Sequence, residues 1–326
     1  MKFCRFCCLA AALLHNVALL ALSPSAHAWG CKGHQVIALI AESRMTPHAY
    51  QSAVRLLKDA PMGPNLPRYC GPKGLDAFAD ASTWADDVRK LRPGTSPWHF
   101  IDIPLGAAKR DMASYCPPET GCVTSALNQQ LAILRDSSAT PQARADALRF
   151  LIHFVGDVHQ PLHAASNNDL GGNCVPVTFF GHAPEESPPG SGSFHPNLHS
   201  VWDTDIVEHL SRKQPSFELA RDLQRKFRSY LETWQTQPAN FATWAWESHE
   251  LAERVVYRRL PRPLPIEGPR PMTACPVQKS GPSHAGRLQI DENLAEPYQN
   301  AAAPFVEEQL AKAGVRLAAL LDSLWQ

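Results

Sequence analysis

The feature that most constrains the fold is a series of helix-length segments along almost the whole chain. Apolar side chains recur near helical spacing from Val36 to Ile40, and Pro47 stands where a second helix would begin. Only residues 175–180 are typical of a strand. The predicted helices are 33–44, 47–58, 75–91, 124–135, 141 to just before Pro161, 199–210, 217–234, 241–260 and 304–324.

We therefore predict an all-α fold: a single mainly helical domain, 29–326, with long Pro-rich loops at 181–196 and 261–283. A chain of 326 residues is long enough to bury a hydrophobic core. Its 31 basic and 31 acidic side chains give a net charge of +0, which argues against a basic nucleic-acid coat or an acidic tail. An anionic substrate must then be held by local charge.

Residues 1–28 are typical of a secretory signal peptide. Lys2 and Arg5 give a positive start, an apolar stretch follows at 9–22, and an A-x-A cleavage motif closes the segment. A membrane anchor is the alternative, but the apolar run is shorter than the ~20 residues that a span needs. We expect a mature protein that begins at Trp29, is secreted or periplasmic, and has no membrane span.

Cysteine usage agrees with export. After residue 28 the number of cysteines is even and no C-x-x-C motif occurs, which favours disulfides over thiolate zinc sites. Cys116 and Cys122 flank a short Pro-rich segment and are predicted to pair. The remaining cysteines allow three pairings, between which the sequence does not choose: Cys31, Cys70, Cys174 and Cys275.

Two His-Asp pairs carry the strongest chemical signal. His153 and Asp157 are four residues apart and share one helix face, and His199 and Asp203 repeat that spacing. One such pair alone is better explained as a neutral core histidine with a salt-bridge partner. Two pairs together with His163, in an exported chain without thiolate sites, favour more than one metal ion.

Other polar residues stand among apolar neighbours. Asp86, His99 and Asp102 do so, and each alone is better explained as a satisfied buried group. After cleavage, Trp29 would offer its α-amine and its carbonyl oxygen as a chelate, and His34 could share that ion. The alternative is a terminal Trp29 that only packs.

Taken together, these pieces resemble the zinc-dependent single-strand nucleases of the S1/P1 type, which are related in fold to the bacterial zinc phospholipases C. The motifs follow the family's order from Trp29 to Asp203, and nine ligand positions in order make the resemblance specific. They are Trp29-Gly-x-x-Gly-His34, Trp84-Ala-Asp86-x-x-Arg89, Trp98-His99-Phe100-x-Asp102, His153-Phe-x-Gly-Asp157-x-x-Gln-Pro-Leu-His163, Gly171-Gly-Asn173 and His199-x-x-x-Asp203.

The resemblance implies three zinc ions. Asp86, His99, His153 and Asp157 would hold the first ion, His163, His199 and Asp203 the second, and Trp29, His34 and Asp157 the third. Such ions can activate a water molecule and neutralise the phosphate and the departing 3′ oxygen. Arg89 would add positive charge at the phosphate, and Asp86 would orient the attacking water.

The resemblance also implies a base pocket. Phe100 would stack on a nucleobase, Asp102 would hydrogen-bond its edge, and Asn173 would shape the pocket. Stacking contributes ~1–3 kcal/mol per base and needs a base that is free of the duplex, which favours single strands. The alternative for Phe100 is a plain core residue.

We therefore expect an exported, zinc-dependent, monomeric endonuclease that hydrolyses RNA and single-stranded DNA to 5′-phosphate products, with 3′-nucleotidase activity as a further expectation. The first alternative is a phospholipase C-like phosphodiesterase, which would favour Glu where this chain has Asp203. The second is a non-catalytic zinc-binding protein. Two departures from the family pattern stay open: His159 is either a spectator or a partner of a ligand, and Cys31, expected in a disulfide, lies close to the third predicted ion.

Overall fold

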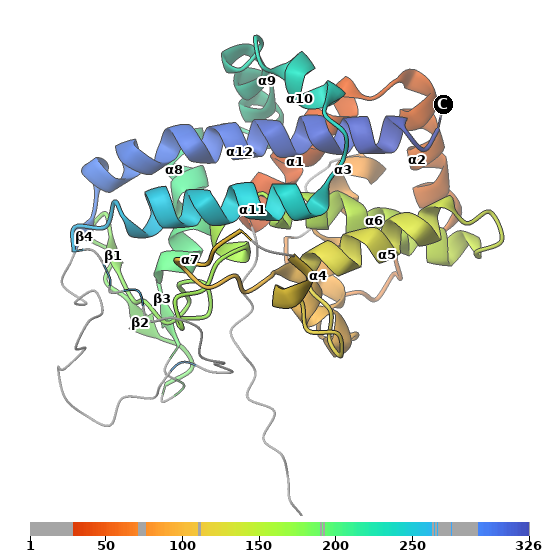
Figure 1. Cartoon of the computed structure of the whole chain (residues 1–326). Helices are drawn as coiled ribbons and strands as arrows, with labels where there is room; N and C mark the ends of the chain where they lie inside the picture. The colour runs from red at the N-terminus through yellow and green to blue at the C-terminus, as the bar shows by residue number, and fades with distance from the viewer. Residues whose placement is uncertain are drawn as a thin grey trace, which may run out of the picture.

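The computed structural model of the chain describes residues 29–70, 76–109, 112–189, 191, 193–262, 264, 266, 275 and 293–325. The predicted signal peptide, 1–28, lies outside the described residues. Within them, helices make up most of the regular structure (Figure 1). The all-α fold class predicted from the sequence is confirmed.

Helices follow one another in chain order, and the strands are only two residues long. The α-helices are α1 Gly30–Arg44, α2 Pro47–Asp59, α3 Ala77–Ala81, α4 Trp84–Val88, α5 Val123–Arg135, α6 Pro141–Asp157, α7 Leu198–Ser200, α8 Ile206–Ser211, α9 Ser216–Lys226, α10 Leu231–Thr236, α11 Phe241–Leu251 and α12 Glu296–Asp322. The 3-10 helices are η1 Pro93–His99, η2 Met112–Tyr115 and η3 Pro161–His163, and the π-helical turns are η4 Val201–Asp205 and η5 Ala252–Tyr257. The strands are β1 Thr178–Phe179, β2 Glu185–Glu186, β3 Phe194–His195 and β4 Asn293–Leu294.

Local sequence explains where the best-predicted helices begin. Thr46 and Thr140 cap α2 and α6 in the same way: each side chain accepts a hydrogen bond from a backbone N–H of the first turn, and a proline follows directly. The capping oxygen satisfies an otherwise unpaired donor, and proline at the first helical position loses no hydrogen bond.

Two predicted helices are interrupted. The segment 75–91 forms α3 and α4 with a break at Ser82 and Thr83, because the carbonyl of Ser82 accepts a hydrogen bond from the His153 ring instead of continuing the helix. The segment 217–234 divides into α9 and α10 around residues 227–230, where the rings of Phe227 and Tyr230 pack on Trp234.

Two further predictions are wrong in extent. Pro304 lies inside α12 rather than at its start; α12 opens with Pro297 in its first turn and packs along α1, which outweighs the ~3 kcal/mol cost of an interior proline. Of residues 175–180, only β1 is a strand, paired in parallel with β4. The predicted loop 181–196 holds the antiparallel pair of β2 and β3.

The core lies where α1, α6 and α12 meet. Helix α12 packs along α1, α5 packs along α6, and α1 also contacts α6 (Figure 1). Gly314 on α12 makes the closest approach possible, because a Cβ at this position would lie 2.6 Å from Cβ of Ile40 on α1. Helices α1 and α6, which carry His34, His153 and Asp157, are therefore packed against the last helix of the chain.

Three disulfides tie loops to this core. They join Cys31 to Cys70, Cys116 to Cys122 and Cys174 to Cys275. The Cys116–Cys122 pairing was predicted from the sequence, and one of the three open pairings of the other four cysteines is now selected. Disulfides are typical of proteins in oxidising compartments.

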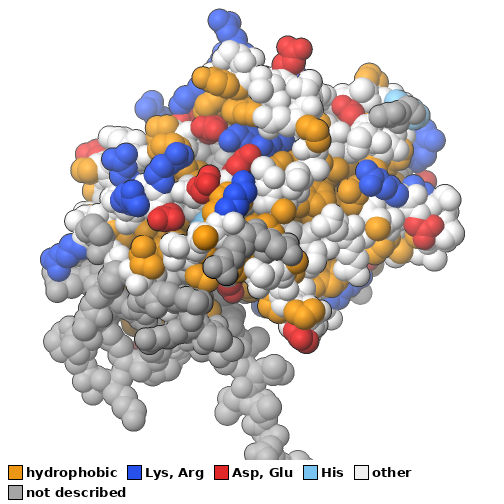
Figure 2. Space-filling model, in the orientation of Figure 1, with side chains coloured by type: hydrophobic (Ala, Val, Ile, Leu, Met, Phe, Trp, Pro, Cys, Tyr) orange, Lys and Arg blue, Asp and Glu red, His pale blue; other side chains and the backbone are white. Residues whose placement is uncertain are grey.

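Among the described residues, none of the helices combines the length and the apolar composition that crossing a membrane requires. On the face in Figure 2, basic and acidic side chains are interspersed with apolar ones, and neither sign of charge covers the face. This agrees with the balanced composition.

Candidate metal centre

The start of α1 brings Trp29 and His34 to the end of α6. Trp29 is fully buried, and its Nε1–H donates to the carbonyl of Gly156 at 2.8 Å. The His34 ring stacks on His153 with 3.8 Å between ring centres. Gly156 makes this possible, because a Cβ there would lie 2.8 Å from Nδ1 of His34.

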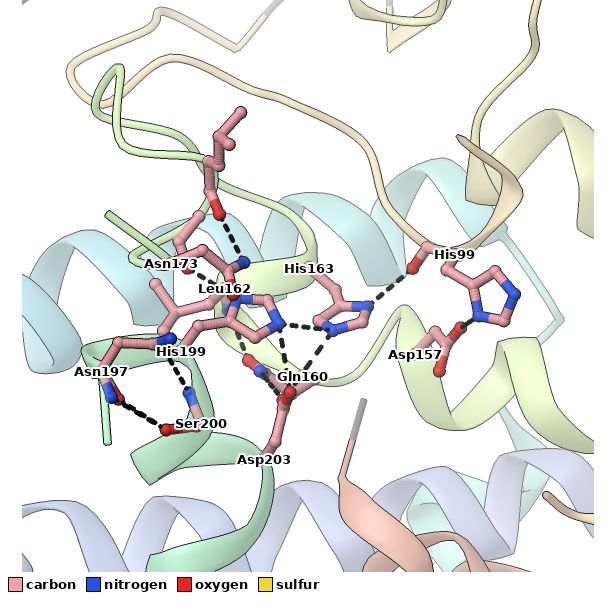
Figure 3. Close-up of polar contacts among 12 residues, drawn as sticks. His99, Asp157, Gln160, Leu162, His163, Asn173, Asn197, His199, Ser200 and Asp203 are labelled. Atoms are coloured by element: carbon pink, nitrogen blue, oxygen red, sulfur yellow. Dashed lines mark hydrogen bonds and ion pairs between the residues drawn. The ribbon is translucent and has the colours of Figure 1, made fainter. Parts of the chain in front are cut away.

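Asp157 lies at the centre of the first group of side chains. Its Oδ1 is 3.3 Å from Nε2 of both His34 and His153. Its Oδ2 is 2.9 Å from Nδ1 of His99, the contact drawn in Figure 3. All four side chains are buried. One carboxylate thus contacts imidazoles from α1, η1 and α6, which is the geometry expected of a residue between two ions.

Asp86 on α4 completes this group. Its carboxylate oxygens lie 3.7 Å from Nδ1 of His99 and 3.8 Å from Nε2 of His153. Ligand atoms of His34, Asp86 and His153, and likewise those of His99, His153 and Asp157, fall within 4.8 Å of one another. Arg89, one turn after Asp86, places Nη1 3.4 Å from Oδ1 of that residue.

His163, His199 and Asp203 form the second group. Nε2 of His199 is 3.1 Å from Oδ2 of Asp203, and Nε2 of His163 is 3.8 Å from its Oδ1 (Figure 3). Asp203 lies in the π-helical turn η4, and such turns are frequent at functional sites. The three ligand atoms again lie within 4.8 Å of one another.

Backbone carbonyls fix how these imidazoles carry their protons. A carbonyl oxygen only accepts hydrogen bonds, so a ring nitrogen facing it at 2.7 Å must donate. In His153, His163 and His199 this nitrogen is Nδ1, and the acceptors are the carbonyls of Ser82, His99 and Gly171, each at 2.7 Å. In a neutral ring, Nε2 then carries a lone pair directed into the site.

His163 and His199 direct these lone pairs at each other. Their Nε2 atoms are 3.1 Å apart. Two acceptors at this distance repel, so the pair needs a positively charged partner between or beside them, either a proton or a metal ion. Burial lowers the pKa of His163 to about 4, which disfavours the proton on that ring. For His199, burial opposes protonation, but the Asp203 carboxylate outweighs it and raises the pKa.

The first group also contains buried side chains that need a cation as a partner. Burial, and then the negative charge of Asp86, raises the pKa of Asp157 well above its usual range, while burial and then Arg89 lower the pKa of His99 well below its own. Within the described residues, neither Asp157 oxygen accepts a hydrogen bond. A divalent cation bound to nitrogen and oxygen donors would satisfy both residues, and this donor set suits zinc.

Several supporting residues had no assigned role in the sequence analysis. Gln160 donates to Oδ1 of Asp203, and its own Oε1 accepts from the backbone N–H of Leu162. Its position in the Asp157-x-x-Gln-Pro motif was the available signal. Asp87, next to Asp86, binds the Arg68 guanidinium with 2.6 Å between Oδ2 and Nε.

The loop around Gly171 is held from a distance. Tyr257 donates its hydroxyl to Oδ2 of Asp169 at 2.8 Å, and the backbone at Asn168, Leu170, Gly171 and Gly172 is left-handed. This conformation aims the Gly171 carbonyl at the His199 ring. No sequence signal connected Tyr257 to this loop, because the two lie far apart in the chain.

The residues predicted to bind a base lie beside the second group. The segment that carries Phe100 and Asp102 runs along η3, with the Ile101 N–H donating to the His163 carbonyl at 2.8 Å and the Ser166 N–H to the Ile103 carbonyl at 2.9 Å. Phe100 is half-buried rather than a core residue.

Asp102 and Asn173 both lie near the loop that contains Asp169 and Leu170. The Asp102 side chain is exposed, yet the protein around it, and then the charge of Asp169, raise the pKa of its carboxyl to about 6. Asn173 is partly buried and uses its side-chain N–H to bind the Leu170 carbonyl at 2.8 Å. Its side-chain oxygen is the group that it can offer to a ligand.

His159 belongs to neither metal group. Its Nδ1 donates to the Val155 carbonyl at 2.7 Å, and its Nε2 accepts from Nη1 of Arg316 at 3.0 Å. Arg316 in turn pairs with Glu247 at 2.7 Å. His159 is therefore part of a separate buried network that joins the end of α6 to α11 and α12.

Comparison with known proteins agrees with this architecture. The sequence profile of the S1/P1 nuclease family matches residues 29–326. Endonuclease 2 of Arabidopsis thaliana is 27% identical over 327 residues, which covers 96% of each chain. Nuclease P1 of Penicillium citrinum is 33% identical over 187 residues (56% of this chain and 59% of that one), and nuclease S1 of Aspergillus oryzae is 30% identical over 201 residues, or 60% of each.

Because the profile covers the whole described domain, the chain belongs to the S1/P1 nuclease family. It is a hydrolytic endonuclease that acts on nucleic acid.

Proposed function

We propose that this nuclease is exported, depends on three zinc ions, and cleaves RNA and single-stranded DNA to 5′-phosphate products as a monomer, with 3′-nucleotidase activity on the same site. The observation that carries the proposal is the pair of Nε2 lone pairs of His163 and His199, 3.1 Å apart and beside Asp203. A metal ion bound to both rings and to Asp203 would satisfy this pair without protonating either ring.

The proposed ligand sets are those that the family resemblance implies. Asp86, His99, His153 and Asp157 would hold one ion, His163, His199 and Asp203 a second, and Trp29, His34 and Asp157 a third. When bound, the ions would supply Lewis acidity, activating a water molecule and neutralising charge on the phosphate. Support for the shared role of Asp157 comes from its contacts with three imidazoles.

The protein's own side chains would orient the substrate. The Arg89 guanidinium, beside Asp86, would attract a phosphate oxygen, and its charge matters most where negative charge grows in the transition state. Asp86 would also orient the attacking water. The ring of Phe100 would stack on an unpaired base, Asp102 would hydrogen-bond the edge of that base, and Asn173 would help to shape the pocket.

The proposal is tested by metal content together with substrate choice. Protein purified without chelator should contain about three zinc ions per chain by elemental analysis. It should cleave single-stranded DNA and RNA much faster than duplex DNA, and it should leave phosphatidylcholine intact. One zinc ion or none would overturn the trinuclear proposal, and equal rates on duplex and single strand would overturn the base pocket.

The role of Trp29 has a test of its own. Removal of residues 1–28 would free the Trp29 α-amine, whereas an amide nitrogen at that position is a poor ligand near neutral pH. The Trp29 carbonyl already accepts a hydrogen bond from the Gly33 N–H at 2.9 Å, and its second lone pair stays available for an ion. Protein with one extra Met before Trp29 should therefore be folded, short of one zinc ion and nearly inactive. Full activity would show that Trp29 only packs.

A further inference from the structure

Tyr69 has an unusual combination of exposure and anchoring. Its side chain is 63% exposed, one of the few large exposed hydrophobic side chains among the described residues. Its backbone N–H, however, donates to Oδ1 of Asp87 at 2.7 Å. The residues on both sides are also fixed: the preceding Arg68 binds Asp87 and Asp80, and the following Cys70 is bonded to Cys31.

Both anchors come from elements that carry proposed ligands. Asp87 directly follows Asp86 on α4, and Cys31 is two residues after Trp29 on α1. The disulfide and the Asp87 contacts thus hold Tyr69 between the start of α1 and α4. A side chain that only filled surface space would not need anchors on two ligand-bearing helices.

The contact of the Tyr69 N–H with Asp87, next to Asp86, and the disulfide of Cys70 place Tyr69 at the edge of the metal centre. After burial, the charges of Asp86 and Asp203 are the causes that raise the pKa of Tyr69. These two carboxylates belong to different ligand groups, one on α4 and the other on η4. The raised pKa agrees with the position that the backbone contacts give to Tyr69.

An exposed ring on an anchored backbone beside the cluster suits stacking on a base. Aromatic side chains bind single strands by stacking on successive bases, and a backbone that is already held in place loses little entropy on binding. Phe100, beside His99, accounts for one base of a substrate. A single strand that crosses the centre presents a second base next to the cleaved bond.

We propose that Tyr69 is a second substrate-binding side chain, whose ring stacks on the base of the nucleotide adjacent to the one that Phe100 holds. The proposal rests on the proposed function, since it requires a single strand to cross the metal centre. It assigns oligonucleotides of at least two nucleotides as the substrates that use this subsite.

Three variants test the proposal: Tyr69→Ala, Tyr69→Phe and, as a matched control, Tyr230→Ala. Tyr230 is 56% exposed and precedes α10, which packs on α12. Each is assayed on a DNA dinucleotide and on two analogues, each abasic at one of the two positions. Zinc content and circular dichroism are measured for all three.

Tyr69→Ala should raise KM for the full dinucleotide about tenfold with kcat and zinc content nearly unchanged, because one stacking contact contributes ~1–3 kcal/mol. Its effect on KM should vanish for one abasic analogue and persist for the other. Tyr69→Phe, which keeps the ring, and Tyr230→Ala should match the unsubstituted protein.

An unchanged KM in Tyr69→Ala, or an equal rise on both abasic analogues, would overturn the proposal. Loss of zinc in Tyr69→Ala would overturn it too, since Tyr69 would then support the metal centre. Failure of the proposed function looks different, because the unsubstituted protein would then not cleave the dinucleotide at all.

Discussion

Beyond the end of α6, buried histidines satisfy their ring nitrogens in two different ways. One way is seen in the network of His159, and the other in the metal centre. In the His159 network, one nitrogen donates to a carbonyl and the other accepts from Arg316, whose charge is paired with Glu247. In the metal centre, His163 and His199 also donate Nδ1–H to carbonyls, but their second nitrogens face each other.

The difference shows which observation separates a structural histidine from a metal ligand. Burial and spacing do not, because His159 is as buried as His153 and lies within the same motif. The decisive feature is what faces the second ring nitrogen: a donor in the structural case, and another acceptor in the case of a ligand. The predictions below test this distinction.

The largest effect is expected for Asp157→Ala. The substitution removes a carboxylate that contacts three imidazoles, so two of the three zinc ions should be lost. Several kcal/mol of charge stabilisation would disappear, and kcat/KM should fall by ~10³-fold or more. Elemental analysis and a single-strand cleavage assay measure both, with the exposed Asp59→Ala as control. Full zinc content in Asp157→Ala would show that Asp157 does not bridge two ions.

A substitution in the His159 network should lower stability but leave the zinc content unchanged. Arg316→Met breaks a mostly buried ion pair and leaves Nε2 of His159 without a donor. Unfolding by urea should show a loss of about 2 kcal/mol, at the low end for such pairs because Glu247 is partly exposed. Zinc content and kcat of the folded protein should persist. If Arg316→Met released zinc instead, the His159 network and the metal centre would be one functional unit.

Phe100→Ala should affect binding alone. The ring follows the ligand His99 but contributes no metal-binding atom, so KM for single strands should rise about tenfold, as expected for one stacking contact of ~1–3 kcal/mol, while zinc stays bound. Phe217→Ala, which removes an exposed ring far along the chain, is the control. A loss of zinc in Phe100→Ala would identify Phe100 as a packing residue of the centre.

The smallest effect concerns a carboxyl outside the His159 network and the metal centre. Burial, and then Asp76, raise the pKa of Glu42 from 4.5 to about 7. Between these values the folded chain keeps a proton that the unfolded chain releases, so stability falls as the pH rises from about 4.5 through 7. Glu42→Gln should raise the thermal midpoint by about 2 °C at pH 8, with little change at pH 5.

Glu42 also contrasts with the carboxylates of the metal centre. Glu42 is a partly buried carboxyl with no cationic partner among the described residues, and we expect it to destabilise the fold at high pH. The carboxylates of the metal centre should instead lose their cost of burial when zinc binds. Equal midpoints of Glu42→Gln and the unsubstituted protein at pH 8 would show that Glu42 is ionised without penalty.

The sequence predicted which side chains of the site lie together better than it predicted the details of the fold. His153 and Asp157 share a helix face by spacing alone, and the structure brings them together as expected. The break between α3 and α4 was not predictable locally, because it depends on a hydrogen bond from His153 to the Ser82 carbonyl. The same holds for Pro304, whose place inside α12 depends on packing against α1.

The supporting residues were the least predictable part. Tyr257 reaches Asp169, and Arg316 reaches His159, across long stretches of sequence. Hydrogen bonds between distant segments leave no periodic pattern in a sequence. Such pairs can be recognised only in the folded structure, whereas pairs four residues apart on one helix can be predicted from the sequence.

The packing of α1 against α12 also sets an order of events during synthesis. Helix α1 is among the first segments of the described domain to emerge, and α12 is the last, so at ~5–20 residues per second α1 waits for its main partner for roughly 15–60 s. During that interval the face of α1 that packs on α12 stays uncovered. The described domain therefore completes its core only after the last helix has left the ribosome.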